Sequence, residues 1–426
     1  MNDGNTNQWN EPPTPLSLKG TYATAIVYAQ QVESQALDQI RELCNQPFSQ
    51  GVRIRVMPDV HAGAGCVIGL TMDLVGSDKV CPNLVGVDIG CGVRVCELGK
   101  VSLDLQRLDE VIRAHVPSGT NVRSGVCPQD RQFFSSVFEP LRIRGEIEKT
   151  KNVNRLEASL GTLGGGNHFI EVDADEQGNQ YLVVHTGSRH LGYTVGKAYQ
   201  KIAVDKDREQ AKNRGMQRIQ EKVRALQQQG RFSEIETTIR KLEKDPVAPA
   251  SKDLAYLEGE DREAYLHDIR LVQAFAVRNR QRIMETILQQ MGCNALGWFE
   301  SVHNYIDDDA VLRKGAISAH EQQRLIIPLN MRDGCILGRG KGNAQWNFSA
   351  PHGAGRLMSR GDAKRSLSME EFQRQMQGIF STSVDQSTLD ESPMAYKPKE
   401  FLLSLLPQTV WLDQIVHPVY NFKASE

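Results

Sequence analysis

Six side chains of metal-ligand or nucleophile type stand in short glycine-rich or strand-like contexts between positions 88 and 352. They are Asp88, Cys91, His168, His185, His303 and His352. A thiolate and imidazoles suit borderline-soft divalent ions, whereas a carboxylate also admits harder ions. The combination predicts a metal-centred active site that holds one manganese, zinc or iron ion, or two.

Each of these motifs also has a plainer interpretation. Asp88 and Cys91 are three positions apart in VGVDIGCGVR, where glycines let the backbone turn both side chains toward one ion. Alone, Cys91 could be a buried structural cysteine, and His185 in VVHT could be a core histidine. Three glycines before Asn167 and His168 are typical of a loop whose amides cradle an anion, although that signal is weak. The coincidence of all six, close to Gly or Asn, favours the metal site.

Basic residues accumulate in the same part of the chain. Between Arg313 and Arg365 there are ten Lys or Arg and three acids, in a chain whose formal net charge is −2. This local excess predicts a site for a polyanion, unless the charges form a solvated surface. Trp346 and Phe348 lie among them as either core or base-stacking groups.

The length of 426 residues is ample for a hydrophobic core and for one large domain or two to three average ones. The eight cysteines include no CxxC pair, which argues against a disulfide framework or a zinc ribbon. No run of apolar residues approaches the length of a membrane span, and the N-terminus does not resemble a secretory leader. We therefore expect a soluble cytoplasmic protein.

The hydrophobic pattern predicts one large α/β domain (mixed α+β) over residues 21–426, after a flexible segment at 1–20. Strands are expected within 53–98, as a hairpin formed by HFIEVD and YLVVHT, and at 310–318 and 324–329. In that hairpin His168 and His185 would lie near the outer ends, within reach of each other. Helices are expected at 24–44, at 102–116 with Ser102 as N-cap, in an insertion at about 192–291, and at 368–379 and 398–417.

Ordered sequence blocks across the chain resemble the signature blocks of the RtcB family. They are PDVHAG (58–63), VGVDIGCG (85–92), GTLGGGNHFIE (161–171), HTGSRHLG (185–192), HN (303–304), RKGA (313–316), SAPHGAGRLMSR (349–360) and DESPMAYKP (390–398). The resemblance implies a single α/β fold and a ligase that uses GTP and manganese. Such a ligase joins an RNA 3′-phosphate or 2′,3′-cyclic phosphate end to a 5′-hydroxyl end, in tRNA splicing or in repair of damaged RNA such as rRNA, and an accessory protein can assist it.

The same resemblance implies a role for each matching residue. The manganese ligands would be Asp88, Cys91, His168, His185 and His303, with Cys91 bridging two ions. His352 would become guanylylated, with Asp59 and Lys314 as further catalytic residues. Nucleotide contacts would come from Asn167, Glu171, Gly353, Gly355, Tyr396 and Lys423, and contacts to RNA or triphosphate from Arg189, Lys314, Arg356 and Arg360.

The chain departs from the family pattern in two places. It has IIPLNMRDG (326–334) where many members have a Gly-Ser-Met-Gly loop, and it ends in HPVYNFKASE, where Asn421 rivals Lys423 as a nucleotide contact. Two other functions remain open from the residues. One is a metal-dependent phosphoesterase acting on RNA ends without a nucleotide. The other is a non-catalytic RNA-binding protein with a structural metal, which dispersed ligands that include a carboxylate disfavour.

Overall fold

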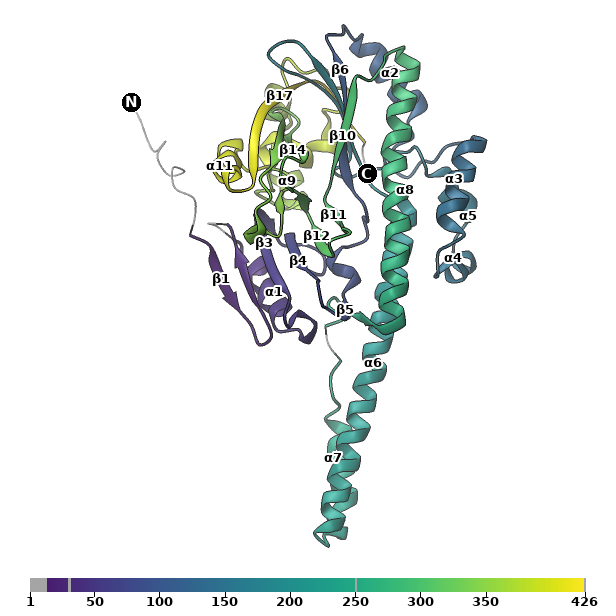
Figure 1. The fold of residues 1–426 in the computed structure, drawn as a ribbon, viewed down its shortest axis with the longest axis vertical. Helices are drawn as coiled ribbons and strands as arrows, with labels where there is room; N and C mark the ends of the chain where they lie inside the picture. Colours follow the sequence, from purple (N-terminus) through teal and green to yellow (C-terminus); the bar gives the residue numbers. More distant parts are fainter. Residues whose placement is uncertain (1–13, 30–31, 250, 425–426) are drawn as a thin grey trace.

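Two large β-sheets form the body of the protein (Figure 1). The structure is a computed structural model that describes residues 14–29, 32–249 and 251–424. The first sheet has six strands, which in spatial order are β1 (Leu16–Lys19), β2 (Thr24–Val27), β3 (Arg53–His61), β4 (Ile68–Asp73), β12 (Val311–Lys314) and β11 (Asn304–Ile306). All neighbouring strands are antiparallel except β2 and β3.

The second sheet has seven strands, all paired antiparallel. In spatial order they are β10 (Gly297–Val302), β6 (Gly92–Gly99), β8 (Gln180–Thr186), β7 (Phe169–Ala174), β17 (Val410–Lys423), β15 (Gly334–Gly340) and β14 (Arg324–Asn330). Two short pairs complete the strands, β13 (Ala316–Ser318) with β16 (Ser349–Pro351), and β5 (Lys79–Val80) with β9 (Leu257–Glu258). The chain passes from the second sheet to the first at His303, between β10 and β11.

Helices surround the sheets, and the longest ones lie along one side (Figure 1). They are α1 (Ser34–Cys44), α2 (Leu105–His115), α3 (Pro128–Phe138), α4 (Arg144–Thr150), α5 (Val153–Ala158), α6 (Arg189–Gln228), α7 (Ile235–Lys244), α8 (Gly259–Met291), α9 (Arg360–Ser366), α10 (Met369–Gln375) and α11 (Lys399–Leu405). The outer part of α6 and α7 extend away from the body as a narrow pair (Figure 1). No helix among the described residues has the length and apolar character needed to cross a bilayer.

The alternation of side chains along β7 and β17 gives the second sheet two different faces. Ile170, Val172, Tyr420 and Phe422 lie in a hydrophobic cluster with Ile283 and Ile287 of α8. The intervening residues of β7 and β17 therefore point to the opposite face, which also carries Val93, Val183 and Cys335 in a second cluster. This second face is the one that supports the candidate site.

Most predicted elements are confirmed. The hairpin forms as β7 and β8, with Phe169 directly opposite His185, and the helical segment forms as α6, α7 and α8. The strands expected at 310–318 and 324–329 form as β12, β13 and β14.

Three predictions were wrong in part. Residues 24–27 form β2 and not the start of a helix, and Asp104 caps α2 in place of Ser102, its side chain accepting a hydrogen bond from the Arg107 amide. The helix expected at 398–417 ends at Leu405, and Val410 begins the long strand β17. The expected flexible segment 1–20 lies outside the described residues up to position 13, and Leu16–Lys19 form β1.

Candidate active site

Five of the predicted ligands converge where the two large sheets meet. The Sγ atom of Cys91 lies 3.5 Å from His168 Nε2 and 3.3 Å from His185 Nε2. His185 Nε2 is 3.4 Å from His303 Nε2, and His168 Nε2 is 3.3 Å from Asp88 Oδ2. The donor atoms form two sets of three, Asp88–Cys91–His168 and Cys91–His185–His303, which share Cys91.

The spacing of these atoms fits a metal ion. Two ligands on one tetrahedral ion, bound at about 2.0–2.3 Å, stand roughly 3.3–3.6 Å apart. The four contacts between donor atoms, from 3.3 to 3.5 Å, agree with that range. The donor set of thiol, carboxyl and imidazole also suits a transition-metal dication.

Backbone carbonyls orient two of the imidazoles. His168 Nδ1 lies 2.9 Å from the carbonyl of Leu163, and His185 Nδ1 lies 3.0 Å from the carbonyl of Asn167. A carbonyl only accepts, so with a metal ion bound each ring would carry its proton on Nδ1, which leaves the Nε2 lone pair for the ion.

The backbone around Asp88 and Cys91 depends on a glycine between them. Gly90 has φ +71, and a Cβ there would lie 2.8 Å from the Cβ of Ala276 on α8. Glycine alone tolerates both the left-handed conformation and this close approach without a shift. The loop therefore brings its carboxyl and thiol to the same side while packing tightly on α8.

Burial controls the protonation of the site. Burial and then the neighbouring imidazoles lower the pKa of His185 and of His303 well below the ordinary value, so both rings stay neutral. Burial and then the Asp88 carboxyl raise the pKa of the Cys91 thiol. Burial also opposes ionisation of Asp88, but hydrogen bonding and charge interaction with His168 outweigh it and lower the pKa of that carboxyl. A divalent ion would favour the thiolate and so reverse the effect at Cys91.

His352 lies beside this cluster and is held by Asp59. His352 follows β16, and its ring centroid is 5.1 Å from that of His303. Asp59 Oδ2 accepts hydrogen bonds from the backbone N–H of His352 at 3.1 Å and from Nδ1 at 2.7 Å. The Asp59 side chain is fully buried, whereas the His352 side chain keeps 20% exposure. The imidazole therefore presents Nε2 to a partly open space.

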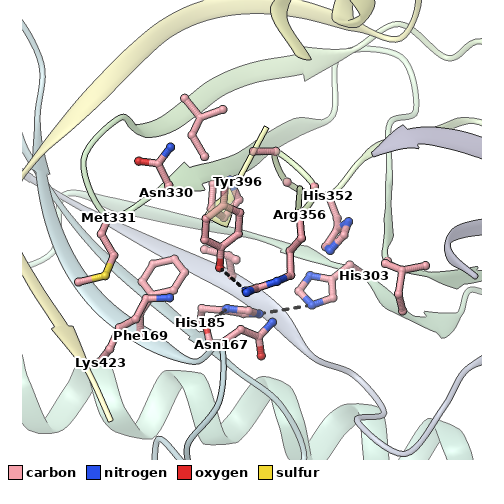
Figure 2. A pocket seen from close by; sticks show the side chains of 18 of the residues that line it. Asn167, Phe169, His185, His303, Asn330, Met331, His352, Arg356, Tyr396 and Lys423 are labelled. Atoms are coloured by element: carbon pink, nitrogen blue, oxygen red, sulfur yellow. Dashed lines mark hydrogen bonds between the residues drawn. The ribbon is translucent and has the colours of Figure 1, made fainter. Parts of the chain in front are cut away.

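That space is a cavity of about 300 Å³. His303 and His352 lie toward one end of it, and Met331, Phe169 and Lys423 lie toward the other, with His185, Tyr396 and Arg356 between them (Figure 2). Every residue predicted to contact the nucleotide, together with Arg356 and Arg360, lines the cavity: Asn167, Glu171, Gly353, Gly355, Arg356, Arg360, Tyr396 and Lys423. Asn421 lines it as well.

The far end of the cavity is organised by Glu391, which the sequence reasoning did not single out. Its carboxylate accepts hydrogen bonds from Tyr396 Oη at 2.6 Å and from Lys423, and it pairs with Arg360 at 2.8 Å and Arg356 at 3.2 Å. Burial alone would raise the pKa of Glu391, but Lys423 and Arg360 lower it to about 2. One buried carboxylate therefore fixes four of the predicted contact residues. Its place inside the DESPMAYKP block was the available signal.

Two of the cations predicted to contact phosphate, Lys314 and Arg189, lie outside the cavity lining. Lys314 Nζ donates to the carbonyls of Ala64 at 2.6 Å and Asn83 at 3.0 Å, and burial lowers its pKa. Arg189 begins α6, and its Nη1 lies 3.2 Å from His168 Nδ1, behind the cluster of donor atoms. In this arrangement both cations lie next to the cluster of donor atoms or its loops, and neither lines the cavity.

Comparison with known proteins decides the family. The family model described as "tRNA-splicing ligase RtcB" matches residues 39–423. The chain belongs to the RtcB family. It is 31% identical over 404 residues to "RNA-splicing ligase RtcB1" of Escherichia coli strain ATCC 25922 and, likewise at 31%, to "RNA-splicing ligase RtcB" of E. coli K12, covering in both cases 86% of this chain and 88% of the relative. It is 27% identical to "tRNA-splicing ligase RtcB" of Aeropyrum pernix, over 88% of this chain and 89% of the relative.

The RtcB match includes every part of the site described above. Asp59, the Cys91 cluster, His352, Glu391 and Lys423 all lie within residues 39–423. The residues brought together here are thus part of the region that defines membership of the RtcB family.

Proposed function

We propose that this protein joins RNA 3′-phosphate or 2′,3′-cyclic phosphate ends to 5′-hydroxyl ends, using GTP and two manganese ions, through a guanylylated His352. The observation that carries the proposal is the position of His352, beside two donor sets that share Cys91 and at the edge of a cavity lined by anion-binding groups. The ligands would be Asp88, Cys91 and His168 for one ion, and Cys91, His185 and His303 for the other. When bound, the ions would neutralise phosphate charge and polarise the reacting phosphorus.

In the first step His352 Nε2 attacks the α-phosphate of GTP, and pyrophosphate leaves. The hydrogen bond to Asp59 holds the proton on Nδ1, so the lone pair of Nε2 is available for the attack. Asp59 then stabilises the positive charge that develops on the ring as the phosphorus–nitrogen bond forms.

Cations and one aromatic ring would hold the nucleotide during this step. Arg356 and Arg360 line the cavity within reach of Glu391, so incoming phosphates would compete with that carboxylate for the guanidinium groups. Tyr396 lies under the Arg356 guanidinium at 5.2 Å and offers a ring face to the nucleoside. Glu171, Asn421 and Lys423 supply an acceptor, an amide and a cation for the base.

In the second step an RNA 3′-phosphate oxygen attacks the phosphorus bound to His352, which regains its lone pair as GMP passes to the RNA. The 5′-hydroxyl of the other RNA end then attacks the activated phosphate, and GMP leaves. A cyclic phosphate would first be opened by water to give the 3′-phosphate. The RNA would be a tRNA exon pair or a damaged RNA such as rRNA, and an accessory protein could accelerate turnover.

The test is labelling of the purified protein with α-labelled GTP and manganese. We expect acid-labile label on the wild type and none on His352→Ala. His320→Ala is the matched control, since His320 is a partly exposed histidine outside the cavity lining and should label normally. Absence of label from the wild type, even with an RNA 3′-phosphate present, would contradict the ligase mechanism. Release of phosphate from RNA ends in that experiment would favour the metal-dependent phosphoesterase.

A further inference from the structure

A second group of metal-ligand side chains lies behind the far wall of the cavity. Glu171 and Asp173 are two positions apart on β7 and so point to the same face of the second sheet. Cys335 lies on β15, across the intervening strand β17. All three side chains are buried, with exposed fractions of 2%, 0% and 0%.

The donor atoms of these residues converge in the manner of the Cys91 cluster. One ligand atom from each of Glu171, Asp173 and Cys335 lies within 4.8 Å of the other two. Cys335 Sγ is 3.6 Å from Glu171 Oε1. A sulfur and an oxygen bound to one tetrahedral zinc-like ion at about 2.3 and 2.0 Å stand roughly 3.5 Å apart.

The surroundings leave this group short of hydrogen-bond donors. Neither carboxyl oxygen of Asp173 receives a hydrogen bond from an amide, hydroxyl or cationic group among the described residues, although the residue is fully buried, and the groups facing it are the Glu171 carboxyl and the Cys335 thiol. Glu171 Oε2 accepts from the Asn421 side chain, which leaves Oε1 facing Cys335. Buried carboxyl oxygens without donors are costly, and a bound cation is one of the few groups that satisfies several at once.

We propose that Glu171, Asp173 and Cys335 bind a third divalent transition-metal ion of the zinc class, separate from the ions of the Cys91 cluster. The ion would take Glu171 Oε1, one oxygen of Asp173 and the Cys335 thiolate, with a water molecule in the fourth position. Mixed thiolate and carboxylate ligation suits zinc or cobalt better than the hard ions calcium and magnesium.

A proton shared between Glu171 and Asp173 would satisfy fewer of the buried polar atoms than a bound ion would. One proton between the two carboxyl groups satisfies a single pair of oxygens, and the Cys335 thiol donates to Glu171 Oε1, which leaves the second Asp173 oxygen without a donor. Without an ion, burial and then the Glu171 carboxyl raise the pKa of Asp173, while burial and then Asp173 raise the pKa of the Cys335 thiol. Three uncharged acids would then occupy the centre of one sheet face, whereas a dication permits their ionised forms.

The ion would also shape the end of the cavity. Glu171 would be held on one side by the ion through Oε1 and on the other by Asn421 through Oε2, which fixes the carboxylate edge that lines the cavity. Asp173 and Cys335 do not line the cavity, so the ion would support it from behind without contacting the nucleotide. The site itself requires neither RNA nor GTP and stands apart from the proposed ligation.

The test uses the full-length protein with Cys91→Ser, which removes the thiolate shared by the two donor sets. This variant is freed of metal and titrated with cobalt(II). Histidine-bound cobalt gives no sulfur-to-cobalt charge-transfer band, so a near-ultraviolet band must come from another cysteine. We expect such a band, saturating at one cobalt per chain, and its loss in Cys91→Ser/Cys335→Ser. Cys91→Ser/Cys66→Ser is the matched control, because Cys66 is equally buried but lies outside the group.

A second measurement covers the case in which loss of Cys335 prevents folding. Asp173→Asn keeps the size of the side chain and removes its charge, and in the Cys91→Ser background it should weaken cobalt binding, read from the charge-transfer band, at least tenfold and reduce the shift in Tm that zinc produces. Absence of a charge-transfer band in Cys91→Ser, or a band that persists without Cys335, would overturn the proposal. Neither readout uses GTP or RNA, so failure of the third site and failure of ligation are separately visible.

Discussion

Cys91 and Cys335 are both buried thiols beside carboxyl groups, but their surroundings differ in one respect. The imidazoles next to Cys91 are anchored through Nδ1 to the carbonyls of Leu163 and Asn167. The carboxyl of Asp173 next to Cys335 has no such anchor. The imidazoles of the first site are held in place by backbone hydrogen bonds, whereas the Asp173 carboxyl of the second site is satisfied only by a cation or by protons. We infer that reaction belongs at the first and structural support at the second.

The largest effect should separate the two thiols by activity. Cys91→Ser removes the shared ligand of both donor sets, and the loss of several kcal/mol of transition-state stabilisation should lower RNA ligation by about a thousandfold or more. Cys335→Ser should lower it by about tenfold at most, through a higher KM for GTP. Single-turnover ligation measured over a range of GTP concentrations, from limiting to saturating, would show both effects. Equal losses of ligation in the two variants would contradict the assignment of reaction to the Cys91 cluster and of structural support to the Cys335 group.

The next effect concerns how His352 is held. Asp59→Asn keeps the shape of the side chain but weakens the preference for a proton on Nδ1, so guanylylation should slow by about a hundredfold. The binding of GTP should change much less, since Asp59 does not line the cavity. Rates of labelling as a function of GTP concentration would separate the two quantities. A change confined to KM would show that Asp59 acts on the nucleotide instead.

A smaller effect is expected on the free energy of unfolding, through Glu391 at the end of the cavity near the second site. The pKa of Glu391 is lowered to about 2 from 4.5, so its contribution is present above the unfolded value and is lost as pH falls through the folded value. The wild type should lose on the order of 3 kcal/mol from this group between about pH 5 and pH 2. The Glu391→Gln variant should be less stable than the wild type at pH 7. Its free energy of unfolding, measured in urea, should change less over the same pH range. Parallel pH curves for the two proteins would contradict this.

The smallest effect is expected far from both thiols. Glu236 and Arg240 form an exposed pair on α7, with side chains 76% and 73% accessible. Exposed pairs of this kind contribute little, because solvent and salt screen them. Glu236→Gln should leave both the unfolding midpoint and ligation within experimental error. A clear loss of ligation would contradict this expectation and would indicate that the α6–α7 pair takes part in function.

The sequence predicted elements well where pattern and length agreed. The β7–β8 hairpin and the helices α6 and α8 have clear periodicity, and tertiary contacts reinforce it. The C-terminal region misled because the apolar run around Leu402 and Leu405 suits a helix, and nothing local shows that it stops there. The helix ends because Val410 onward pairs with β15 and β7 at once, which is a contact between distant segments.

The candidate site was predictable to the extent that its residues stand in unusual local contexts. Cys91 and His168 are surrounded by glycines, which draws attention to them. Cys335 and Asp173 occupy ordinary strand positions, and only the order of strands in the sheet brings them together. For Lys314 the resemblance of the RKGA block implied a phosphate contact, which stays a prediction, while the ammonium group donates to two backbone carbonyls in this structure.

Strand β17 has a consequence for the timing of synthesis. It is made after every other described element, yet it lies between β7 and β15 and carries Asn421 and Lys423 into the cavity. On the ribosome the Cys91 cluster and His352 are therefore complete in sequence before the second sheet can close. A nascent or C-terminally shortened chain would carry the Cys91 cluster beside an unfinished cavity. Under the proposed function, guanylylation by GTP would therefore begin only once the whole sheet is present.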